Sequence, residues 1–272
     1  MEAQFSVLMS VYAKDCSEWV KQALDSVLSN TVVPDEIILV IDGPVCEELQ
    51  TLLQEYAGKH PQLKLCPLAQ NGGLGAALAY GLQQCSHELV ARMDADDISL
   101  PDRFEKQLAY FSARPQTAVL GGWIEEVDSE TLQPVAIREV PHTNEQIKRF
   151  LQTRSPFNHV TVMFKKSAVL AVGNYQPFHF LEDYYLWARL AAAGCELANL
   201  SDILLRVRVD SAMYGRRGGW KYFKSNLVMS SKLRELGLIS WSTHLFNVSV
   251  RFCVQVLMPK GLRSWFYRGA LR

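Results

Sequence analysis

The 272-residue sequence predicts an α/β fold in which a mostly parallel central sheet is flanked by helices. Strand and helix patterns alternate through the first hundred residues, and this repetition is typical of strand–helix–strand units with right-handed crossovers. The expected strands are short runs rich in Val, Ile and Leu, as strands buried on both faces are. The chain is also long enough to bury the core of one domain of this kind.

The elements of this first region follow from the period of the apolar residues. Apolar runs predict strands at 5–11, 36–41, 63–65 and 89–93. Helical spacing predicts helices between them, at 17–28, 47–57 and 74–85. A further helix is expected from Pro101 to Phe111, because proline is favoured at the start of a helix. Ligands of open α/β sheets bind at the carboxyl ends of the strands, so functional residues are expected there.

The regular alternation ends near residue 117. Strands are expected at 119–127, 134–140, 159–164 and 203–209, and helices at 144–151 and 182–193. Two helices, 220–236 and 241–258, precede a basic, aromatic tail. We therefore divide the chain into a main α/β domain, 1–210, and a C-terminal helical extension, 211–272.

The net charge is zero, but it is unevenly distributed. Residues 1–205 contain 15 Lys and Arg against 26 Asp and Glu, whereas residues 206–272 contain 13 against 2. The basic end indicates an anionic partner, which can be a phosphate, a nucleic acid or a membrane surface. We expect no nucleic-acid partner, because no nucleic-acid-binding motif accompanies the charge.

Other features of the composition indicate a cytoplasmic protein. The six cysteines form no C-x-x-C pair and most lie in apolar surroundings, so reduced thiols are favoured over disulfides or a zinc site. The N-terminus lacks the basic segment of a secretory signal, and no apolar run reaches the roughly 18–20 residues that span a bilayer.

An acidic run, Arg92-Met93-Asp94-Ala95-Asp96-Asp97, follows the expected strand at 89–93. Three carboxylates placed together repel one another. A divalent cation removes that cost, and carboxylate oxygens are the ligands that Mg²⁺ and Mn²⁺ prefer. Capping of the next helix would need only one aspartate. We therefore expect this run to bind Mg²⁺ or Mn²⁺, with a diphosphate on the metal.

Five short motifs in a fixed order carry a resemblance to a known family. They are the segments 5–12, 36–43, 71–75 (Asn-Gly-Gly-Leu-Gly), 94–97 (Asp-Ala-Asp-Asp) and 181–187 (Leu-Glu-Asp-Tyr-Tyr-Leu-Trp). Together they resemble family 2 glycosyltransferases, which have the GT-A fold with a Rossmann-like nucleotide-binding half. The resemblance covers about residues 5–210. It is strongest to bacterial enzymes that build lipopolysaccharide, O-antigen or capsule.

The resemblance implies a binding site for a nucleotide-sugar donor, most readily a UDP-sugar. Its expected contacts come from four motifs and from Arg92 next to one of them: Ser10, Val11, Tyr12, Asp42, Asn71, Gly73, Leu74, Arg92, Asp94, Ala95 and Asp96. The resemblance places the metal on Asp96, with Asp97 in support, and implies that Asp94 holds the ribose or a metal-bound water. Asp42 would accept a hydrogen bond from the base, although an Asx turn with Gly43 is an alternative. Many relatives have a second acidic residue where this chain has Ile41. The glycine-rich loop before Leu74 can also be a plain turn into a helix.

The resemblance assigns the acceptor side to residues further along the chain. Asp183, or Glu182 in its place, would be the general base of an inverting single displacement. Both carboxylates could instead merely stabilise a helix N-terminus. His159 would lie on the acceptor side or be structural. Arg216 and Arg217 would bind the donor diphosphate or a lipid-linked diphosphate, or remain in a solvated loop.

The tail beyond residue 240 combines apolar, aromatic and basic residues: Leu245, Phe246, Val250, Arg251, Val254, Leu257, Lys260, Arg263, Trp265, Phe266, Tyr267, Arg268 and Arg272. This mixture suits peripheral contact with an anionic membrane, or a helix packed on the main domain with a basic rim. We therefore expect transfer of one sugar to a lipid-linked saccharide at the cytoplasmic face of the inner membrane. A nucleotidyltransferase and a non-catalytic scaffold in polysaccharide assembly remain alternatives.

Overall fold

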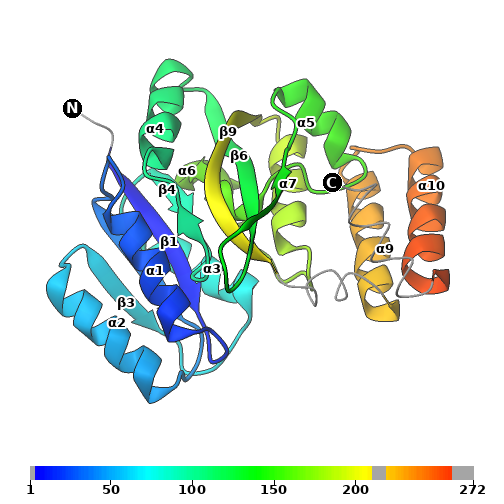
Figure 1. Cartoon of the computed structure of the whole chain (residues 1–272). Helices are drawn as coiled ribbons and strands as arrows, with labels where there is room; N and C mark the ends of the chain where they lie inside the picture. The colour runs from blue at the N-terminus through cyan, green and yellow to red at the C-terminus, as the bar shows by residue number, and fades with distance from the viewer. Residues whose placement is uncertain (1–3, 210–218, 259–272) are drawn as a thin grey trace.

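The computed structural model describes residues 4–209 and 219–258, which form an α/β structure around one nine-stranded sheet. Four strands in the order β3 (Leu63–Pro67), β2 (Glu36–Ile41), β1 (Phe5–Val11) and β4 (Leu89–Arg92) are parallel. Their alternation with helices confirms the expected nucleotide-binding type of half-domain. It also brings the carboxyl ends of four strands to the same edge of the sheet (Figure 1).

The second half of the sheet is mixed. After β4 come β8 (Met163–Lys165), β6 (Thr117–Asp128), β9 (Glu196–Val209) and β5 (Ile98–Ser99). The pairs β4–β8, β6–β8 and β5–β9 are antiparallel, whereas β6 and β9 run parallel, and β7 (Pro134–Arg138) pairs with β6. The long β6–β9 pair brings residues 117–128 beside residues 196–209.

Helices cover both faces of the sheet, and side chains alternate between two cores because successive strand residues point to opposite faces. Val7 and Met9 pack with α1 (Ser17–Leu28), α2 (Glu47–Lys59) and α4 (Arg103–Ala113). Leu8 lies in the other core. That core contains residues of three helices, α3 (Leu74–Gln84), α5 (Asn144–Leu151) and α7 (Glu182–Ala192). The molecule is therefore a three-layer α/β/α arrangement.

The C-terminal helices α9 (Trp220–Glu235) and α10 (Trp241–Phe252) form a hairpin beside α7 (Figure 1). Met229 and Leu233 of α9 belong to the same core as α7, so α9 packs on the main domain. The expected helix 241–258 ends earlier as an α-helix, because a π-helical turn, Cys253–Leu257, follows α10.

Two expectations around residue 160 and residue 200 were wrong in their bounds. The strand expected at 159–164 begins only at Met163, because residues His159–Thr161 form a 3₁₀ turn. There the Thr161 hydroxyl donates to the Asn158 carbonyl at 2.8 Å, and the Asn158 amide donates to the Gly122 carbonyl at 2.9 Å. The strand expected at 203–209 begins at Glu196, since pairing with β6 extends it through a polar stretch.

Two short elements went unpredicted. They are β5, which has two residues, and α6 (Lys166–Ala171). Both are too short to leave a periodic pattern in the sequence.

Candidate active site

The candidate site lies where β1, β2 and β4 end. Val11 pairs with Ile41, and Leu8 pairs with Arg92, so the loops that leave these strands emerge at one edge of the sheet. These loops contain the sequence-predicted residues Tyr12, Asp42 and Asp94. The fold therefore brings together three motifs that lie about 30 and 50 residues apart in the chain.

Three carboxylates meet at this edge. Side-chain oxygens of Asp94, Asp96 and Asp97 all lie within 4.8 Å of one another. Burial raises the pKa of Asp96 to about 6, and the neighbouring Asp94 carboxylate adds to the shift. Burial also raises the pKa of Asp97 well above its ordinary range, with Asp96 and Asp94 as further causes. Hard oxygen donors gathered at this spacing, and destabilised by their mutual repulsion, fit a divalent cation.

A fourth carboxylate, Asp15, borders the cluster and was not predicted. Its Oδ2 accepts a hydrogen bond from the Tyr12 N–H at 2.9 Å, which closes the loop after β1. Burial is the main cause that raises the pKa of Asp15 to about 6; the Tyr12 N–H opposes the shift, and the charges of Asp96 and Asp94 add to it. The sequence shows Asp15 only as a loop acid before α1, so its approach to the cluster is a product of the tertiary fold.

Arg208 of β9 holds the acidic loop from the opposite side. Its backbone N–H donates to Asp97 Oδ1 at 3.1 Å, and its Nε donates to the Asp96 carbonyl at 2.8 Å. The guanidinium also lies over the Trp19 ring, 5.2 Å from its centroid. Arg206 instead pairs with Glu125 at 2.8 Å. Both arginines belong to the strand β9.

Arg92 interacts electrostatically with both groups of carboxylates that the sequence singled out. Its side chain is 1% exposed and its Nη2 donates to Asp94 Oδ1. Burial disfavours its charge, but Asp94 and other neighbours outweigh that effect and raise its pKa. Its Nε and Nη1 have no hydrogen-bond partner within the described parts of the chain. A buried cation with unused donors is suited to an anionic ligand.

The Asp42 side chain faces the glycine-rich loop. Its Oδ1 accepts from the Gly72 N–H at 2.7 Å, and its Oδ2 accepts from the Gly73 N–H at 2.9 Å and the Asn71 amide at 3.0 Å. Gly73, with φ +83°, precedes Leu74, the first residue of α3. Asp42 thus fixes the loop at the start of α3. A carboxylate has about four acceptor positions, so one remains for a nucleobase N–H.

The other expected donor contacts lie close by. Ser10 and Val11 are the last residues of β1, and Tyr12 is 40% exposed at the edge of the sheet. Ala95 is buried between Asp94 and Asp96. These positions are consistent with the expected donor site.

The Glu182–Asp183 pair begins α7 and lies beside the glycine-rich loop. A Cβ built on Gly75 would lie 3.4 Å from the Cβ of Glu182. Burial raises the pKa of Glu182 to about 7, and the negative charge of Asp183 contributes. Burial also raises the pKa of Asp183, although the Tyr184 N–H and the Ser155 hydroxyl, at 3.2 Å, oppose the shift. Two carboxyl groups with raised pKa values are suited to accept a proton.

His159 is held in an aromatic setting near Arg92. Its Nε2 lies 2.9 Å from the Tyr175 hydroxyl, and its ring packs edge-on against Trp187 at 5.9 Å between centroids. Burial lowers the pKa of His159 well below its usual range, and the charge of Arg92 lowers it further. The ring is therefore neutral at physiological pH. Arg216 and Arg217, the other expected acceptor-side residues, lie outside the described residues.

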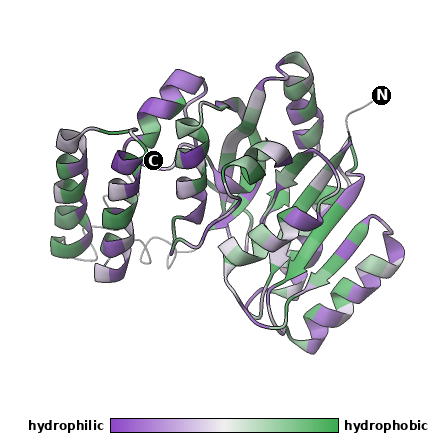
Figure 2. Ribbon diagram, turned by 180° about the vertical axis from the view of Figure 1, so that it is seen from behind, coloured by the Kyte–Doolittle hydropathy of each residue, from purple (hydrophilic) through white to green (hydrophobic). Residues whose placement is uncertain are grey.

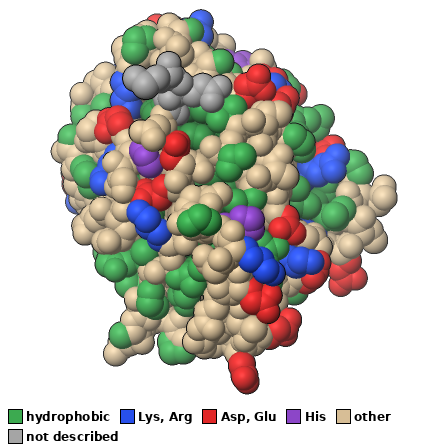
Figure 3. Space-filling model, turned by 90° about the vertical axis from the view of Figure 1, so that its left-hand side faces the viewer, with side chains coloured by type: hydrophobic (Ala, Val, Ile, Leu, Met, Phe, Trp, Pro, Cys, Tyr) green, Lys and Arg blue, Asp and Glu red, His purple; other side chains and the backbone are tan. Residues whose placement is uncertain are grey.

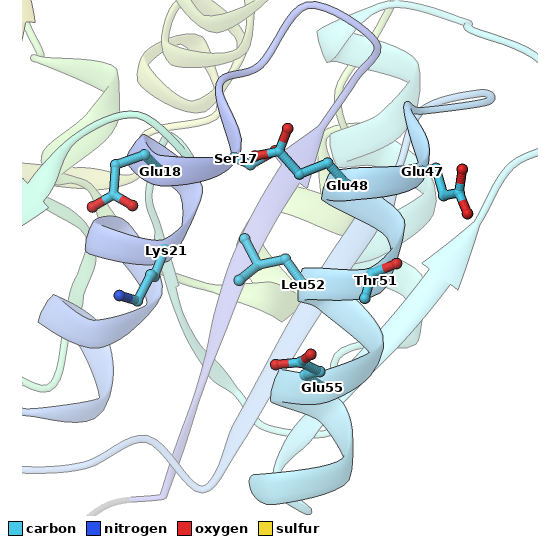
Figure 4. A pocket seen from close by; sticks show the side chains of 8 residues that line it. All are labelled: Ser17, Glu18, Lys21, Glu47, Glu48, Thr51, Leu52 and Glu55. Carbon is cyan, nitrogen blue, oxygen red and sulfur yellow. The ribbon is translucent and has the colours of Figure 1, made fainter.

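A hollow of about 510 Å³ lies away from this site, between α1 and α2 (Figure 4). Glutamates dominate its lining, which consists of Ser17, Glu18, Lys21, Glu47, Glu48, Thr51, Leu52 and Glu55. Lys21 is the one cation in this lining of the described structure, so the hollow does not suit a nucleoside diphosphate.

Comparison with known proteins agrees with this geometry. The family model described as glycosyl transferase family 2 matches residues 6–173, and the chain belongs to that family. It is 39% identical to the amylovoran biosynthesis glycosyltransferase AmsE of Erwinia amylovora, over 97% of each chain. It is 36% identical to a UDP-Gal:alpha-D-GlcNAc-diphosphoundecaprenol beta-1,3-galactosyltransferase of Escherichia coli, over 99% of this chain and 97% of that protein.

Solved structures share the fold. The S. aureus TarS 1-349 complex with UDP-GlcNAc has a TM-score of 0.69 at 16% identity, and the match covers 97% of this chain and 78% of TarS 1-349. The Pyrobaculum calidifontis mannosyltransferase PcManGT, in complex with GDP-Man and Mn²⁺, has a TM-score of 0.63 at 15% identity, covering all of this chain and 81% of that one. The expected GT-A architecture is thereby confirmed.

Proposed function

We propose that this glycosyltransferase moves one hexosyl or N-acetylhexosaminyl unit from a UDP-sugar to a lipid-linked saccharide, with inversion at the anomeric carbon. The observation that carries the proposal is that one buried arginine, Arg92, interacts with two carboxylate groups near the edge of the sheet. One group is Asp94, Asp96 and Asp97, whose charges include two that raise the pKa of Arg92, and the other is Glu182 and Asp183, whose pKa values the charge of Arg92 holds down. One group suits the donor diphosphate and the other suits an attacking hydroxyl.

On the donor side, Asp96 and Asp94 would hold a divalent cation, with Asp97 in support. Such a cation neutralises the charge on the two phosphates of the donor and on the departing nucleoside diphosphate. Arg92 would add its unused N–H groups to the same charge. Asp42, Tyr12 and the loop at Asn71–Gly73 would surround the base and ribose. A UDP-Gal-dependent relative and a TarS complex with UDP-GlcNAc support uracil as the base.

On the acceptor side, Asp183 would take the proton from the attacking hydroxyl, with Glu182 next to it. Its raised pKa makes it a better base than an exposed aspartate. The neutral His159 would orient the acceptor through its pair with Tyr175. The Escherichia coli relative acts on a diphosphoundecaprenol-linked sugar, and we infer an acceptor of that class here.

We also propose that residues 1–210 form the catalytic domain and residues 211–272 an extension, with the enzyme at the cytoplasmic face of the inner membrane. Of the earlier alternatives, a nucleotidyltransferase is not retained, because the family match defines another class of transferase. The scaffold alternative is tested by measuring sugar transfer, because a scaffold needs no carboxylate base and would transfer no sugar.

The test is a transfer assay with UDP-Gal, UDP-Glc and UDP-GlcNAc and a synthetic GlcNAc-diphospholipid acceptor, followed by mass spectrometry. The proposal predicts addition of one sugar from one of these donors, with release of UDP. The anomeric configuration is then read by nuclear magnetic resonance. Absence of transfer from every donor, by folded protein that binds UDP, would contradict the proposed acceptor class.

A further inference from the structure

A helix of a water-soluble domain normally buries its apolar face. The helix α10 instead directs polar residues inward and exposes large apolar residues to solvent. Three polar residues of α10 point inward: His244, Asn247 and Arg251. The His244 ring lies 2.9 Å from the Ser230 hydroxyl of α9, and the Asn247 amide donates to the Gln152 carbonyl at 2.8 Å. Arg251 donates to the Asn226 side chain and to the Thr153 carbonyl. These bonds fix the rotation of α10 about its axis.

The opposite face of α10 is apolar and open to solvent. The exposed fractions are 62% for Trp241, 61% for Leu245, 65% for Phe246 and 43% for Val250, and Leu257 in the following turn is 63% exposed. Positions 245 and 246 lie on the half of the helix opposite the inward residues, and positions 241 and 250 lie at the two edges of that half. Figure 2 shows α10 at the outer edge of the molecule, with hydrophobic residues along much of its length. An exposed apolar face of this kind indicates an interaction surface.

The neighbouring helix α9 presents basic and aromatic residues at its own surface. On α9, Lys221 and Lys224 are exposed, next to Trp220 at 58% and Val228 at 49% exposed. Trp220 and Trp241 stand at opposite ends of the hairpin, where Trp220 packs near Phe252 and Trp241 lies under the Arg234 guanidinium. Residues 219–258 contain five Lys and Arg against one acidic residue, and the sequence 259–272 adds four more basic residues and no acidic one.

We propose that the outward face of the α9–α10 hairpin, with Trp241, Leu245, Phe246 and Val250 at its centre and Lys221 and Lys224 at its side, docks on an anionic lipid bilayer. The apolar side chains enter the boundary between headgroups and acyl chains, and the lysines bind the anionic headgroups. Basic residues near such a surface strengthen binding to anionic lipids. No helix among the described residues meets the length and hydrophobicity needed to cross a bilayer.

The charge favours a bilayer over a second copy of this chain. Two such hairpins facing each other would bring together two surfaces of like charge, which repel, whereas anionic lipids attract both. The opposite end of the molecule, at α1, α2 and β3, differs, because acidic and basic side chains are intermixed there (Figure 3). The inference rests on the proposed function in one respect: a lipid-linked acceptor brings the enzyme to a membrane.

The test is co-sedimentation of the full chain with vesicles of phosphatidylcholine alone and of phosphatidylcholine mixed with phosphatidylglycerol. We expect binding only to the anionic vesicles, weakened by added NaCl. The double variant Leu245→Ser, Phe246→Ser should bind at least about tenfold more weakly, because two apolar side chains no longer enter the bilayer. The matched control is Val135→Ser, Ile137→Ser on β7, whose side chains are 50% and 51% exposed, and it should bind like the unmodified protein.

A charge-reversal variant tests the proposed attraction between the lysines and the anionic headgroups. Lys221→Glu, Lys224→Glu should lose binding to anionic vesicles, whereas Lys21→Glu, Lys59→Glu, with the same change in net charge on α1 and α2, should not. Binding of UDP to every variant is measured in parallel. If the protein binds UDP but not anionic vesicles, the docking proposal fails and the proposed function stands. If the unmodified protein does not bind UDP, the proposed function is contradicted instead.

Two results would overturn the proposal. One is equal vesicle binding by the Leu245, Phe246 variant and its β7 control. The other is a dimer in solution that fails to bind vesicles and becomes a monomer in the Leu245, Phe246 variant, because the face would then join two copies.

Discussion

The backbone N–H of Arg208 in β9 donates a hydrogen bond of 3.1 Å to Oδ1 of Asp97, across 111 residues of sequence. This bond connects β9 to the acidic loop after β4. It leaves fewer acceptor positions free on Asp97 than on a fully solvated carboxylate. Asp97 is therefore suited to orient the loop, while Asp96 and the second oxygen of Asp94, whose Oδ1 bonds Arg92, remain for a ligand.

Replacing Arg208 with methionine should loosen the acidic loop. The variant Arg208→Met removes the donors to the Asp96 and Ser129 carbonyls while keeping an apolar stem over Trp19. We expect the free energy of unfolding to fall by about 1–3 kcal/mol and metal-dependent UDP binding to weaken. Chemical denaturation and calorimetry measure the two effects. The control is Arg206→Met, whose half-exposed ion pair with Glu125 should matter little. Equal effects of both variants would contradict this role of Arg208.

Removal of the proposed base should lower turnover without loss of the donor. Asp183→Asn keeps the shape and the contact to Ser155 but cannot accept a proton in the same way. We expect kcat to fall by about 10²–10⁴, with the Kd for UDP unchanged, because a general base acts on the chemical step. The variant Glu182→Gln should lower kcat by a smaller factor than Asp183→Asn. A larger loss for Glu182→Gln than for Asp183→Asn would exchange the two roles.

The pH dependence follows from the raised pKa values of this pair. A base works in its deprotonated form, so transfer should fall as the pH drops through the raised pKa of Asp183, above the range of an ordinary aspartate. Glu182→Gln should keep this acid limb, whereas Asp183→Asn should remove it. A limb that disappears only in Glu182→Gln would identify Glu182 as the base.

The same shift has a consequence for stability. The pKa of Glu182 is about 7 in the folded protein and 4.5 in its ordinary state. The folded state therefore loses stability as the pH rises from about 4.5 to about 7, because the unfolded chain ionises first. Glu182→Gln should therefore raise the melting temperature at about pH 8 and leave it nearly unchanged at about pH 5. A lower melting temperature at both pH values would contradict the pKa shift.

A buried carboxylate at the other edge of the sheet should govern acid stability. Glu36 is 2% exposed and accepts hydrogen bonds from Ser6, Lys64 and Ser86 at 2.7–2.8 Å. Burial alone would raise its pKa, but these hydrogen bonds outweigh burial and lower it to about 2. The unfolded state binds the proton more tightly, so the stabilisation is present above about pH 4.5 and is lost as the pH falls toward about 2.

The variant Glu36→Gln tests this role. Glutamine presents an NH₂ group to donors, so we expect a loss of about 1–3 kcal/mol in unfolding free energy near neutral pH. The loss should shrink as the pH approaches 2, because the unmodified protein then loses the same interaction. Denaturation at several pH values measures it, and a constant difference would contradict the account.

Most of the first half of the fold was predictable from sequence, because buried parallel strands and amphipathic helices leave clear apolar periods. The strands at Phe5–Val11 and Glu36–Ile41 and the helix at Ser17–Leu28 have the expected bounds. The start of β9 was not predictable, because pairing with β6 at Asn199 and again at Ile203 keeps the polar residues Ser201 and Asp202 within an extended strand. The 3₁₀ turn at His159 depends on hydrogen bonds to Gly122, which is distant in sequence.

The candidate site was predictable where motifs are local and not where the fold assembles it. Asp94, Asp96 and Asp183 follow from short motifs. Asp15 reaches the cluster only through the loop after β1, and Arg208 only through the long strand β9. The inward polar face of α10 was also hidden, because its partners Gln152 and Thr153 precede it by about 95 residues.

The central claim is that Asp94 and Asp96 form a metal-dependent site for a nucleoside diphosphate. Calorimetric titration with UDP, GDP, dTDP and CMP, each with Mn²⁺ and again with EDTA, tests it most directly. The account predicts that UDP binds with Mn²⁺, that EDTA abolishes this binding, and that Asp96→Ala loses it while remaining folded. Binding of UDP by Asp96→Ala as tight as by the unmodified protein, or binding that is indifferent to EDTA, would contradict the account.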